Sequence, residues 1–440
     1  MTFSIDRVRA RVASQKTLLP ALYGGFDFDA TPERFTHDAG LAVVRERRPM
    51  GVELAAEDIE LVRAYTMLGD VVADAYAALI PTHGFRQLIG MLTKACDEGL
   101  ESVADAPPEL VAFIRDMERI PEWLDMDLVR KGARLDRNAT AHLAPFAIRG
   151  AFIATFLNKY SALPMALTGA LGNETAARRV NETATFFATT VLPGALERHG
   201  EGFKAAAMVR LMHSMVRFNA LRSGRWDRDV YGVPIPQVDQ MPAGLIPIFL
   251  MAFKLMGEGR TEFTPDERAK VELARYRCFL LGLPEDLLAD TPEGIVRVMT
   301  ARNSTLRQGF DDDTCGALVR ATLAAYLPPD RSLGSRIHNA MERSFAKAFF
   351  LRQFLGGDRG KAQAMGVHVG AVDQAVFALM AVGIGFRMTI FRALGRVPAL
   401  SGAVDAVLVR RIRRLLVRYG HAEFTTDASH YRPSLGVARA

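Results

Sequence analysis

The sequence predicts an all-α fold, and two observations lead to this prediction. Apolar residues recur at helical spacing through most segments, as in the stretch from Ala56 to Ile80. No long run of alternating β-branched residues and no Asn-Gly hairpin signal occurs. We therefore expect helices along the whole chain, joined by short loops.

Capping residues mark where several of these helices begin and end. In Thr264-Pro265-Asp266-Glu267, the threonine suits an N-cap, the proline suits the first helical position, and the glutamate completes a capping box. Thr291-Pro292 repeats the start signal, and Gly282 with Pro284 ends the preceding helix. Proline-rich loops are expected at 231–236 and 327–330.

Composition and charge exclude several protein classes. The chain has 440 residues, is 49% hydrophobic and carries a net charge of +6, which excludes a disordered chain. Three cysteines exclude a disulfide scaffold and suit a reducing compartment. Charged residues interrupt the N-terminal apolar residues, so no signal peptide is predicted and a cytoplasmic location is expected.

Two apolar runs and one basic segment bear on membrane contact. Gly244–Phe253 and Ala375–Phe386 are shorter than the roughly 18 residues that cross a bilayer, and we expect both to be buried core helices. Val409–Arg418 holds five arginines in a basic amphipathic pattern. Such a helix is either a solvated face or a contact with an anionic membrane surface, whereas no nucleic-acid partner is expected.

The helical segment from Phe203 to Phe218 contains the histidine that is most suited to chemistry. His213 has small and apolar residues on its face of the helix, with Arg210 at i−3 and Arg217 at i+4. This pattern suits a planar apolar cofactor with carboxylates: His213 would bind iron and an arginine would pair with a propionate. The alternative is a core histidine with two arginines that reach solvent.

A second helix, expected over 173–190, carries Arg179, Glu182 and Thr183. Arg179 and Thr183 share one face because they are four residues apart, and Glu182 is adjacent. If this helix is internal, the three side chains form a polar patch. The arginine and threonine would then donate hydrogen bonds to bound dioxygen, and Glu182 would act as a base.

These two motifs resemble those of the latex-clearing rubber oxygenases and the related membrane-bound oxygenase of mycophenolic acid synthesis. The run Arg210–Arg217 is similar to the family's R-x-x-H-x-x-V-R signature, and Arg179–Thr183 resembles its distal R-x-x-K-T motif; His199 also fits the spacing. The resemblance implies haem b in a globin-like helical core with additional N- and C-terminal helices. It further implies that His213 is the proximal iron ligand, that Arg179 and Thr183 lie on the distal side, and that Arg217 supports the haem or the proximal helix.

The sequence departs from the family at two positions. The distal lysine is replaced by Glu182, and the region of the family's catalytic glutamate, Leu157–Pro164, has no carboxylate. Glu182 is the candidate replacement for that base. Together with the missing export signal, these departures favour a smaller, intracellular apolar substrate over rubber.

Three functions remain open at this point, on one predicted organisation. The first is a haem-dependent oxygenase that uses dioxygen and an apolar substrate; the second is a haem sensor or carrier without oxygenase activity. The third is a cofactor-free helical protein that binds membranes peripherally. The organisation expected is an N-terminal helical extension, 1–119, an oxygenase-like core, 120–330, and a C-terminal helical extension, 331–440.

Overall fold

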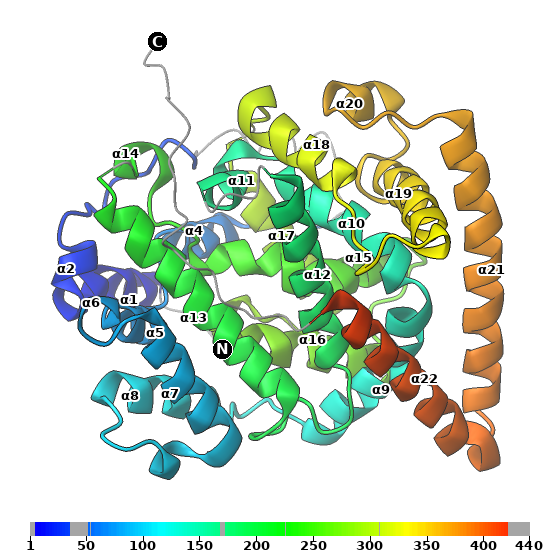
Figure 1. Cartoon of the computed structure of the whole chain (residues 1–440). Helices are drawn as coiled ribbons and strands as arrows, with labels where there is room; N and C mark the ends of the chain where they lie inside the picture. The colour runs from blue at the N-terminus through cyan, green and yellow to red at the C-terminus, as the bar shows by residue number, and fades with distance from the viewer. Residues whose placement is uncertain are drawn as a thin grey trace. The chain divides into compact units, whose positions relative to one another are not determined.

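The computed structural model describes residues 5–35, 52, 54–167, 172–224, 226–307 and 309–420. Helices make up nearly all of the regular structure of these residues (Figure 1). Phe35 and Leu306 form an isolated antiparallel bridge, and the described residues form no strand. The prediction of an all-α fold is confirmed.

The chain divides into two compact units, which we call unit 1 and unit 2. Unit 1 comprises residues 1–136 and 189–308, and unit 2 comprises 137–188 and 309–440. Each unit therefore combines segments that are distant in the sequence. The helix α9 (Met126–His142) begins in unit 1 and continues into unit 2.

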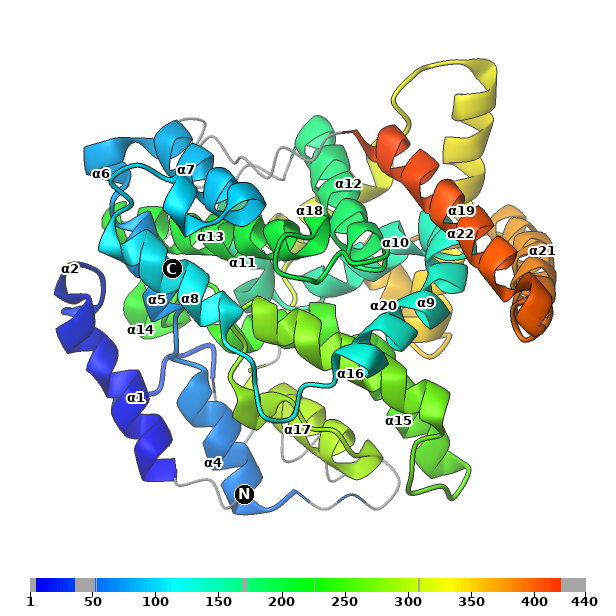
Figure 2. The same ribbon diagram turned by 90° about the horizontal axis from the view of Figure 1, so that it is seen from below.

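In unit 1, α13 packs against α5, α7 and α16, while α17 packs against α15 and α4 (Figure 2). The α-helices are α1 (Ile5–Leu18), α2 (Pro20–Tyr23), α4 (Ala56–Tyr65), α5 (Val71–Ala77), α6 (Ile80–His83), α7 (Phe85–Glu98), α8 (Pro108–Glu118), α9 (Met126–His142), α13 (Glu201–Arg222), α14 (Arg228–Tyr231), α15 (Met241–Gly257), α16 (Pro265–Leu280) and α17 (Pro292–Thr305). Short 3-10 helices are η1 (Leu100–Ser102), η3 (Gln237–Gln240) and η4 (Glu285–Leu287).

Unit 2 is built on the packing of α10 against α19 and of α19 against α21. Its described elements are α10 (Ala144–Ile153), η2 (Ala154–Phe156), α11 (Lys159–Leu167), α12 (Asn173–Thr189), the π-helix η5 (Asp312–Gly316), α18 (Ala317–Ala324), α19 (Leu333–Phe354), α20 (Arg359–Ala364), α21 (Ala371–Gly395) and α22 (Pro398–Tyr419). At Gly150 of α10, a Cβ atom would lie 2.6 Å from the carbonyl oxygen of Ala346. Glycine therefore permits the close approach of α10 to α19.

The predicted helix boundaries are confirmed where capping chemistry was used. The Thr264 side chain accepts from the backbone N–H of Glu267, whose carboxylate accepts in return from Thr264. The Thr291 hydroxyl accepts from Gly294, and α17 begins at Pro292. The predicted loop at 327–330 lies within a non-helical segment, 325–330. The other predicted loop, 231–236, begins one residue later, because Tyr231 is the last residue of α14. The segment from Thr425 onward is outside the described residues.

The continuous helical pattern of 56–80 forms two helices instead of one. The structure has α4 and then α5, separated at residues 66–70. The side chain of Asp70 accepts from the backbone N–H of Ala73, 3.2 Å away, and so caps α5. Periodicity alone did not reveal this break, because the apolar spacing continues through it.

The prediction that two apolar runs are buried core helices is wrong for the second run and incomplete for the first. In α15 one face is buried, but Leu250 is 40% exposed. In α21, one apolar face is exposed: Leu379 is 74% exposed and Phe386 is 67% exposed. The helix is also longer than the apolar run, at 25 residues, and is long and apolar enough to cross a membrane, although one such helix is weak support for a span. Helix–helix packing decides which face is covered, and it leaves most of α21 uncovered.

Candidate functional site

Helix α13 carries three of the predicted residues, Arg210, His213 and Arg217. Its first turn holds Glu201 and its last turn holds Arg222, charges that suit the two ends of the helix dipole. Small alanines at 205–207 are buried and allow neighbouring helices to pack closely. The sequence therefore forms a long helix whose position is fixed along most of its length.

One side of α13 forms a half-buried stripe around His213. Between residues 208 and 216, every half-buried side chain other than His213 is apolar: Met208, Val209, Met212 and Val216. An imidazole within an apolar and incompletely covered stripe fits the face of a planar hydrophobic macrocycle. The residues present on this side of α13 therefore fit a haem.

The imidazole of His213 is oriented by Gln240. The Gln240 side-chain nitrogen Nε2 lies 2.7 Å from Nδ1 of His213, and Gln240 is itself 6% exposed. A glutamine amide can present either its nitrogen or its oxygen to an imidazole, so it can hold either tautomer. A histidine that binds a metal through one ring nitrogen is usually held in place by a hydrogen bond at its other ring nitrogen.

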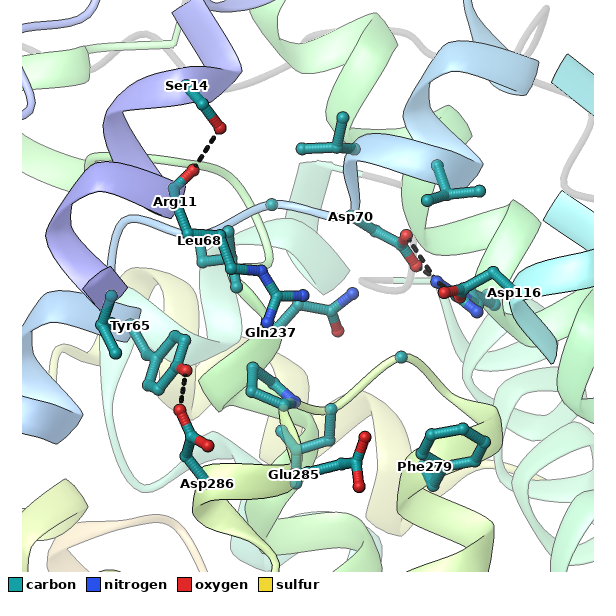
Figure 3. A pocket seen from close by; sticks show the side chains of 18 of the residues that line it. Arg11, Ser14, Tyr65, Leu68, Asp70, Asp116, Gln237, Phe279, Glu285 and Asp286 are labelled. Atoms are coloured by element: carbon teal, nitrogen blue, oxygen red, sulfur yellow. Dashed lines mark hydrogen bonds and ion pairs between the residues drawn. The ribbon is translucent and has the colours of Figure 1, made fainter. Parts of the chain in front are cut away.

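Arg210 is buried in an ion-pair cluster with Asp70 and Asp116. Its Nε and Nη2 atoms contact the Asp70 carboxylate, the second at 2.9 Å, and Nη2 lies 2.7 Å from Asp116 Oδ2 (Figure 3). Burial raises the pKa of Asp70, but the charge and hydrogen bonds of Arg210 outweigh it and hold this pKa below its ordinary value. Arg210 joins α13 to the start of α5 and to α8.

Arg217 is 1% exposed and pairs with Asp74. Its guanidinium also donates to the carbonyl oxygens of Pro234, at 2.9 Å, and Ile235, at 2.6 Å. Tyr23 donates to the second oxygen of Asp74 at 2.5 Å. Burial raises the pKa of Asp74 above its ordinary value despite the opposing charge of Arg217.

These contacts exclude the alternative, raised from the sequence, that the two arginines reach solvent. Neither Arg210 nor Arg217 reaches solvent, because both are buried and paired with carboxylates. Both arginines hold α13 against other segments of unit 1. Their predicted roles toward a haem stay predictions.

A polar pocket of about 420 Å³ opens beside Arg210 within unit 1 (Figure 3). Gln237, Phe279 and the Tyr65–Asp286 hydrogen-bonded pair contribute to its walls. Four arginines and four carboxylates line it: Arg7, Arg11, Arg119, Arg210, Asp70, Asp116, Glu285 and Asp286. This lining suits a small polar molecule and not an apolar macrocycle, so we do not assign the haem to this pocket.

Helix α12, in unit 2, carries the predicted polar group. Arg179 and Glu182 are 6% and 7% exposed, and Arg179 Nη1 donates to Glu182 Oε2 at 2.9 Å. The Thr183 hydroxyl donates to the carbonyl oxygen of Arg179 at 2.9 Å, within the helix. Burial raises the pKa of Glu182, with Arg179 opposing the rise. The predicted polar patch required this part of the helix to be internal, and the burial of Arg179 and Glu182 meets that requirement.

The structure places the predicted residues in two sets. Arg210, His213 and Arg217 lie in unit 1, and Arg179, Glu182 and Thr183 lie in unit 2. His199, which also fitted the family spacing, is exposed in unit 1, where its Nδ1 lies 3.0 Å from the carbonyl oxygen of Cys96.

Sequence reasoning missed the acidic partners on which α13 depends. Asp70 and Asp74 are four residues apart, and this helical spacing is the only signal that the sequence offered for them. In the structure both carboxylates contact arginines of α13. It also missed Arg149, which is fully buried in unit 2. Arg149 donates to Glu342 at 2.6 Å and to the carbonyl oxygens of Thr322 and Ala325.

No group of three or more His, Cys, Asp or Glu side chains in the described parts of the chain could hold a metal ion. A haem iron has a different requirement, because the macrocycle supplies most of its ligands and the protein can supply a single axial histidine. His213, on the half-buried stripe, is the candidate for that ligand.

A model of the family described as "ER-bound oxygenase mpaB/B'/Rubber oxygenase, catalytic domain" matches residues 139–382. This match begins inside the predicted segment 120–330 and ends in the predicted C-terminal extension, and the limits of the functional domain stay a prediction. No curated protein matches the chain.

Among solved structures, the chain resembles latex clearing protein in its closed state. The TM-score is 0.54 at 19% sequence identity, over 80% of this chain and 91% of that one. At this identity the likeness concerns the fold. The family match shows membership in the family, because the matched residues make up more than half of the 440 residues. The chain therefore belongs to the oxygenase family that contains the ER-bound oxygenase mpaB and the rubber oxygenases.

Proposed function

We propose that this chain is a b-type haem-dependent oxygenase, with His213 as the axial iron ligand and an apolar substrate that contains a carbon–carbon double bond. The observation that supports the haem most directly is the stripe of α13. There His213 lies among half-buried apolar side chains, and its Nδ1 is within hydrogen-bonding distance of Gln240. Membership in an oxygenase family supports the reaction class.

A bound haem would supply the iron at which dioxygen is activated. The residues of unit 1 would then act on its axial ligand. Gln240 fixes the rotation of the imidazole, while Arg210 and Arg217 anchor α13 to Asp70 and Asp74. The apolar side chains on either side of His213 would exclude water from the macrocycle face.

The residues of α12 are proposed to assist the oxygen chemistry. Arg179 is a buried cation beside Glu182, and a cation at such a position can stabilise a developing negative charge on oxygen. Glu182 can hold a proton at a higher pH than an ordinary glutamate, because burial raises its pKa. Thr183 donates to the carbonyl of Arg179, and its hydroxyl would have to rotate before it donates elsewhere.

An absorption spectrum of the purified chain, oxidised and then reduced with carbon monoxide, tests the haem proposal. We expect a Soret band that is lost in His213→Ala and retained in His199→Ala, an exposed histidine of the same unit. Both variants should keep the helical far-ultraviolet spectrum. A colourless wild-type protein, even after haem is supplied during expression, would refute the proposal and favour a cofactor-free protein.

Oxygen uptake with apolar alkenes, together with product analysis, tests the oxygenase reaction. Arg179→Ala should retain the Soret band and lose about 2.7–4 kcal/mol of transition-state stabilisation, which is roughly 100-fold to 1000-fold in rate. Arg178→Ala removes an adjacent arginine whose side chain is 58% exposed and should leave the rate nearly unchanged. Equal loss in both variants would contradict the proposed role of Arg179.

A haem sensor or carrier without oxygenase activity is the second candidate. It is favoured by the lack of a carboxylate in Leu157–Pro164, and by the ion pair that binds Glu182 to Arg179. A chain that keeps its Soret band and binds carbon monoxide, yet consumes no oxygen with any alkene, would select this candidate.

A further inference from the structure

The last two described helices of unit 2 form a helical hairpin with an exposed apolar side. α21 and α22 are joined at residues 395–398 and contact one another (Figure 1, orange and red). On α21 and the joint, large apolar side chains are exposed at helical spacing: Val372, Leu379, Val382, Phe386, Ile390, Leu394 and Val397. We call these seven residues the apolar stripe.

The apolar stripe is unusual because of its exposure and because charges are absent along it. Val372, Leu379 and Val382 are 73–74% exposed, and Phe386 is 67% exposed. From Gln374 to Phe386, 13 consecutive residues carry no charge. An apolar surface of this extent in water is costly, so it marks an interaction site.

The hairpin also carries the whole net charge of the chain. Residues 371–419 contain eight arginines and two aspartates, a net +6, which equals the +6 of all 440 residues. Both aspartates are neutralised locally, Asp373 by Lys347 and Asp405 by Arg137. The charges that this hairpin presents to its surroundings are therefore almost entirely positive.

The arginines of α22 divide between its two sides. Leu408 and Ile412 are buried, and Arg411 donates to the carbonyl of Ala141 at 2.9 Å. The exposed side carries the remaining arginines of the basic segment together with two exposed valines: Val407, Arg410, Arg413, Arg414, Val417 and Arg418. On α21, the exposed arginines are Arg387 and Arg392, which flank the stripe, and Arg396 follows at the joint.

We propose that this hairpin binds the surface of an anionic lipid bilayer, with the apolar stripe inserted among the lipid chains and the arginines at the phosphate level. An apolar face bordered by basic residues is the pattern of helices that lie in the plane of a membrane. A second copy of the chain is disfavoured as the occupant, because two surfaces of charge +6 repel one another. Nucleic acid would satisfy the arginines and leave the stripe in water.

The packing of α21 supports a position in the plane of the membrane and not across it. Met380 and Ile384, on the side opposite the stripe, are buried against Phe345 and Ala147. A helix that crossed a bilayer alone would instead present apolar residues to lipid on all sides. One face of α21 belongs to the core of unit 2, and only the other is available to lipid.

Vesicle flotation of the full chain tests the proposal, using vesicles of phosphatidylcholine alone and vesicles that also contain phosphatidylserine. We expect flotation with the anionic vesicles and much weaker flotation with the neutral ones. High salt should reduce the binding, because it screens the arginine contribution.

Two sets of variants separate the apolar and basic contributions. Leu379→Ser with Val382→Ser and Phe386→Ser should lower the partition constant by more than about tenfold. Arg410→Gln, Arg413→Gln and Arg414→Gln should lower it about fivefold per arginine on anionic vesicles only. Leu333→Ser, a 72% exposed leucine of α19, is the matched control and should change little.

Several results would overturn the proposal. One is a wild-type chain that does not float, and another is flotation that the three serine substitutions leave unchanged. A third is a dimer that light scattering detects and that the serine substitutions dissociate, which would make a second copy the occupant. Resistance to alkaline extraction would indicate a spanning helix. A nucleic acid bound more tightly than the anionic vesicles would also contradict it. None of these readouts depends on haem or on oxygenase activity.

Discussion

Replacing Arg217 by methionine should destabilise unit 1 far more than a surface substitution would. Methionine keeps much of the apolar stem and removes the charge, which leaves the fully buried Asp74 with Tyr23 as a remaining hydrogen-bond donor. Removal of one partner from a buried ion pair costs about 3–5 kcal/mol. With a urea dependence of about 3 kcal/mol per M for a unit of this size, the midpoint should fall by roughly 1–1.7 M.

Tryptophan fluorescence makes this measurement specific to unit 1. The chain has two tryptophans, Trp123 and Trp226, and both lie in unit 1. The urea transition of fluorescence therefore reports this unit, whereas far-ultraviolet circular dichroism reports both. Arg222→Met is the matched control: Arg222 is exposed on the same helix, where its guanidinium lies 5.1 Å from the Phe218 ring centre, and its loss should cost less than about 1 kcal/mol.

The loss in free energy of unfolding caused by Arg217→Met, which we call its deficit, should also depend on pH in a known direction. Burial raises the pKa of Asp74 in the folded state, and removal of Arg217, which opposes the rise, should raise it further. A carboxyl whose folded pKa is above its unfolded value stabilises the fold when it is protonated, and this stabilisation is lost as the pH rises through the folded pKa. The deficit should therefore shrink as the pH is lowered from neutral toward about 5.

Asp74→Asn combined with Arg217→Met separates the charge from the packing. This double variant has no buried carboxylate at the position, so its deficit should be smaller than the sum of the two single deficits and nearly independent of pH. The reasoning is refuted if Arg217→Met shifts the midpoint no more than Arg222→Met. It is also refuted if the deficit grows on acidification.

Two further substitutions test other parts of the fold. Arg149→Met, in unit 2, should cost about 3–5 kcal/mol because it leaves Glu342 buried without its cation; circular dichroism should show the loss, and an unchanged circular dichroism transition would contradict it. Thr264→Ala removes the capping box of α16 and should cost about 1 kcal/mol in the fluorescence transition, while Thr264→Ser restores most of it.

Helices and their capping were predictable from sequence because both depend on residues close together in the chain. Thr264 and Glu267 are three positions apart, and the pattern around His213 repeats every three or four residues. The break between α4 and α5 was missed because the apolar spacing is continuous there and the capping by Asp70 was not recognised. Helix boundaries were thus predictable where the capping residue itself was recognised in the sequence.

The partners of the buried arginines could not be predicted, since they come from distant parts of the chain. Arg210 and Asp70 are 140 positions apart, and Arg149 and Glu342 are 193 apart. An arginine on a helix is most often exposed, so its spacing gives no indication of burial. The exposure of α21 was missed for the converse reason. An apolar run is usually buried, and only the packing of α19 against one face shows that the other face is uncovered.

The buried ion pairs differ in what they connect, and this difference bears on the candidate residues. The pairs of Arg210, Arg217 and Arg149 each join segments that are far apart in sequence, so they hold helices together. The Arg179–Glu182 pair joins residues one turn apart on α12, so this ion pair does not hold the helix against another element. Burying two charges is costly and an apolar pair would often serve stability better. Arg179 and Glu182 are both almost fully buried, and burial raises the pKa of Glu182. Because such perturbed titratable groups are common at sites that carry out chemistry, this favours the two residues as candidate functional residues.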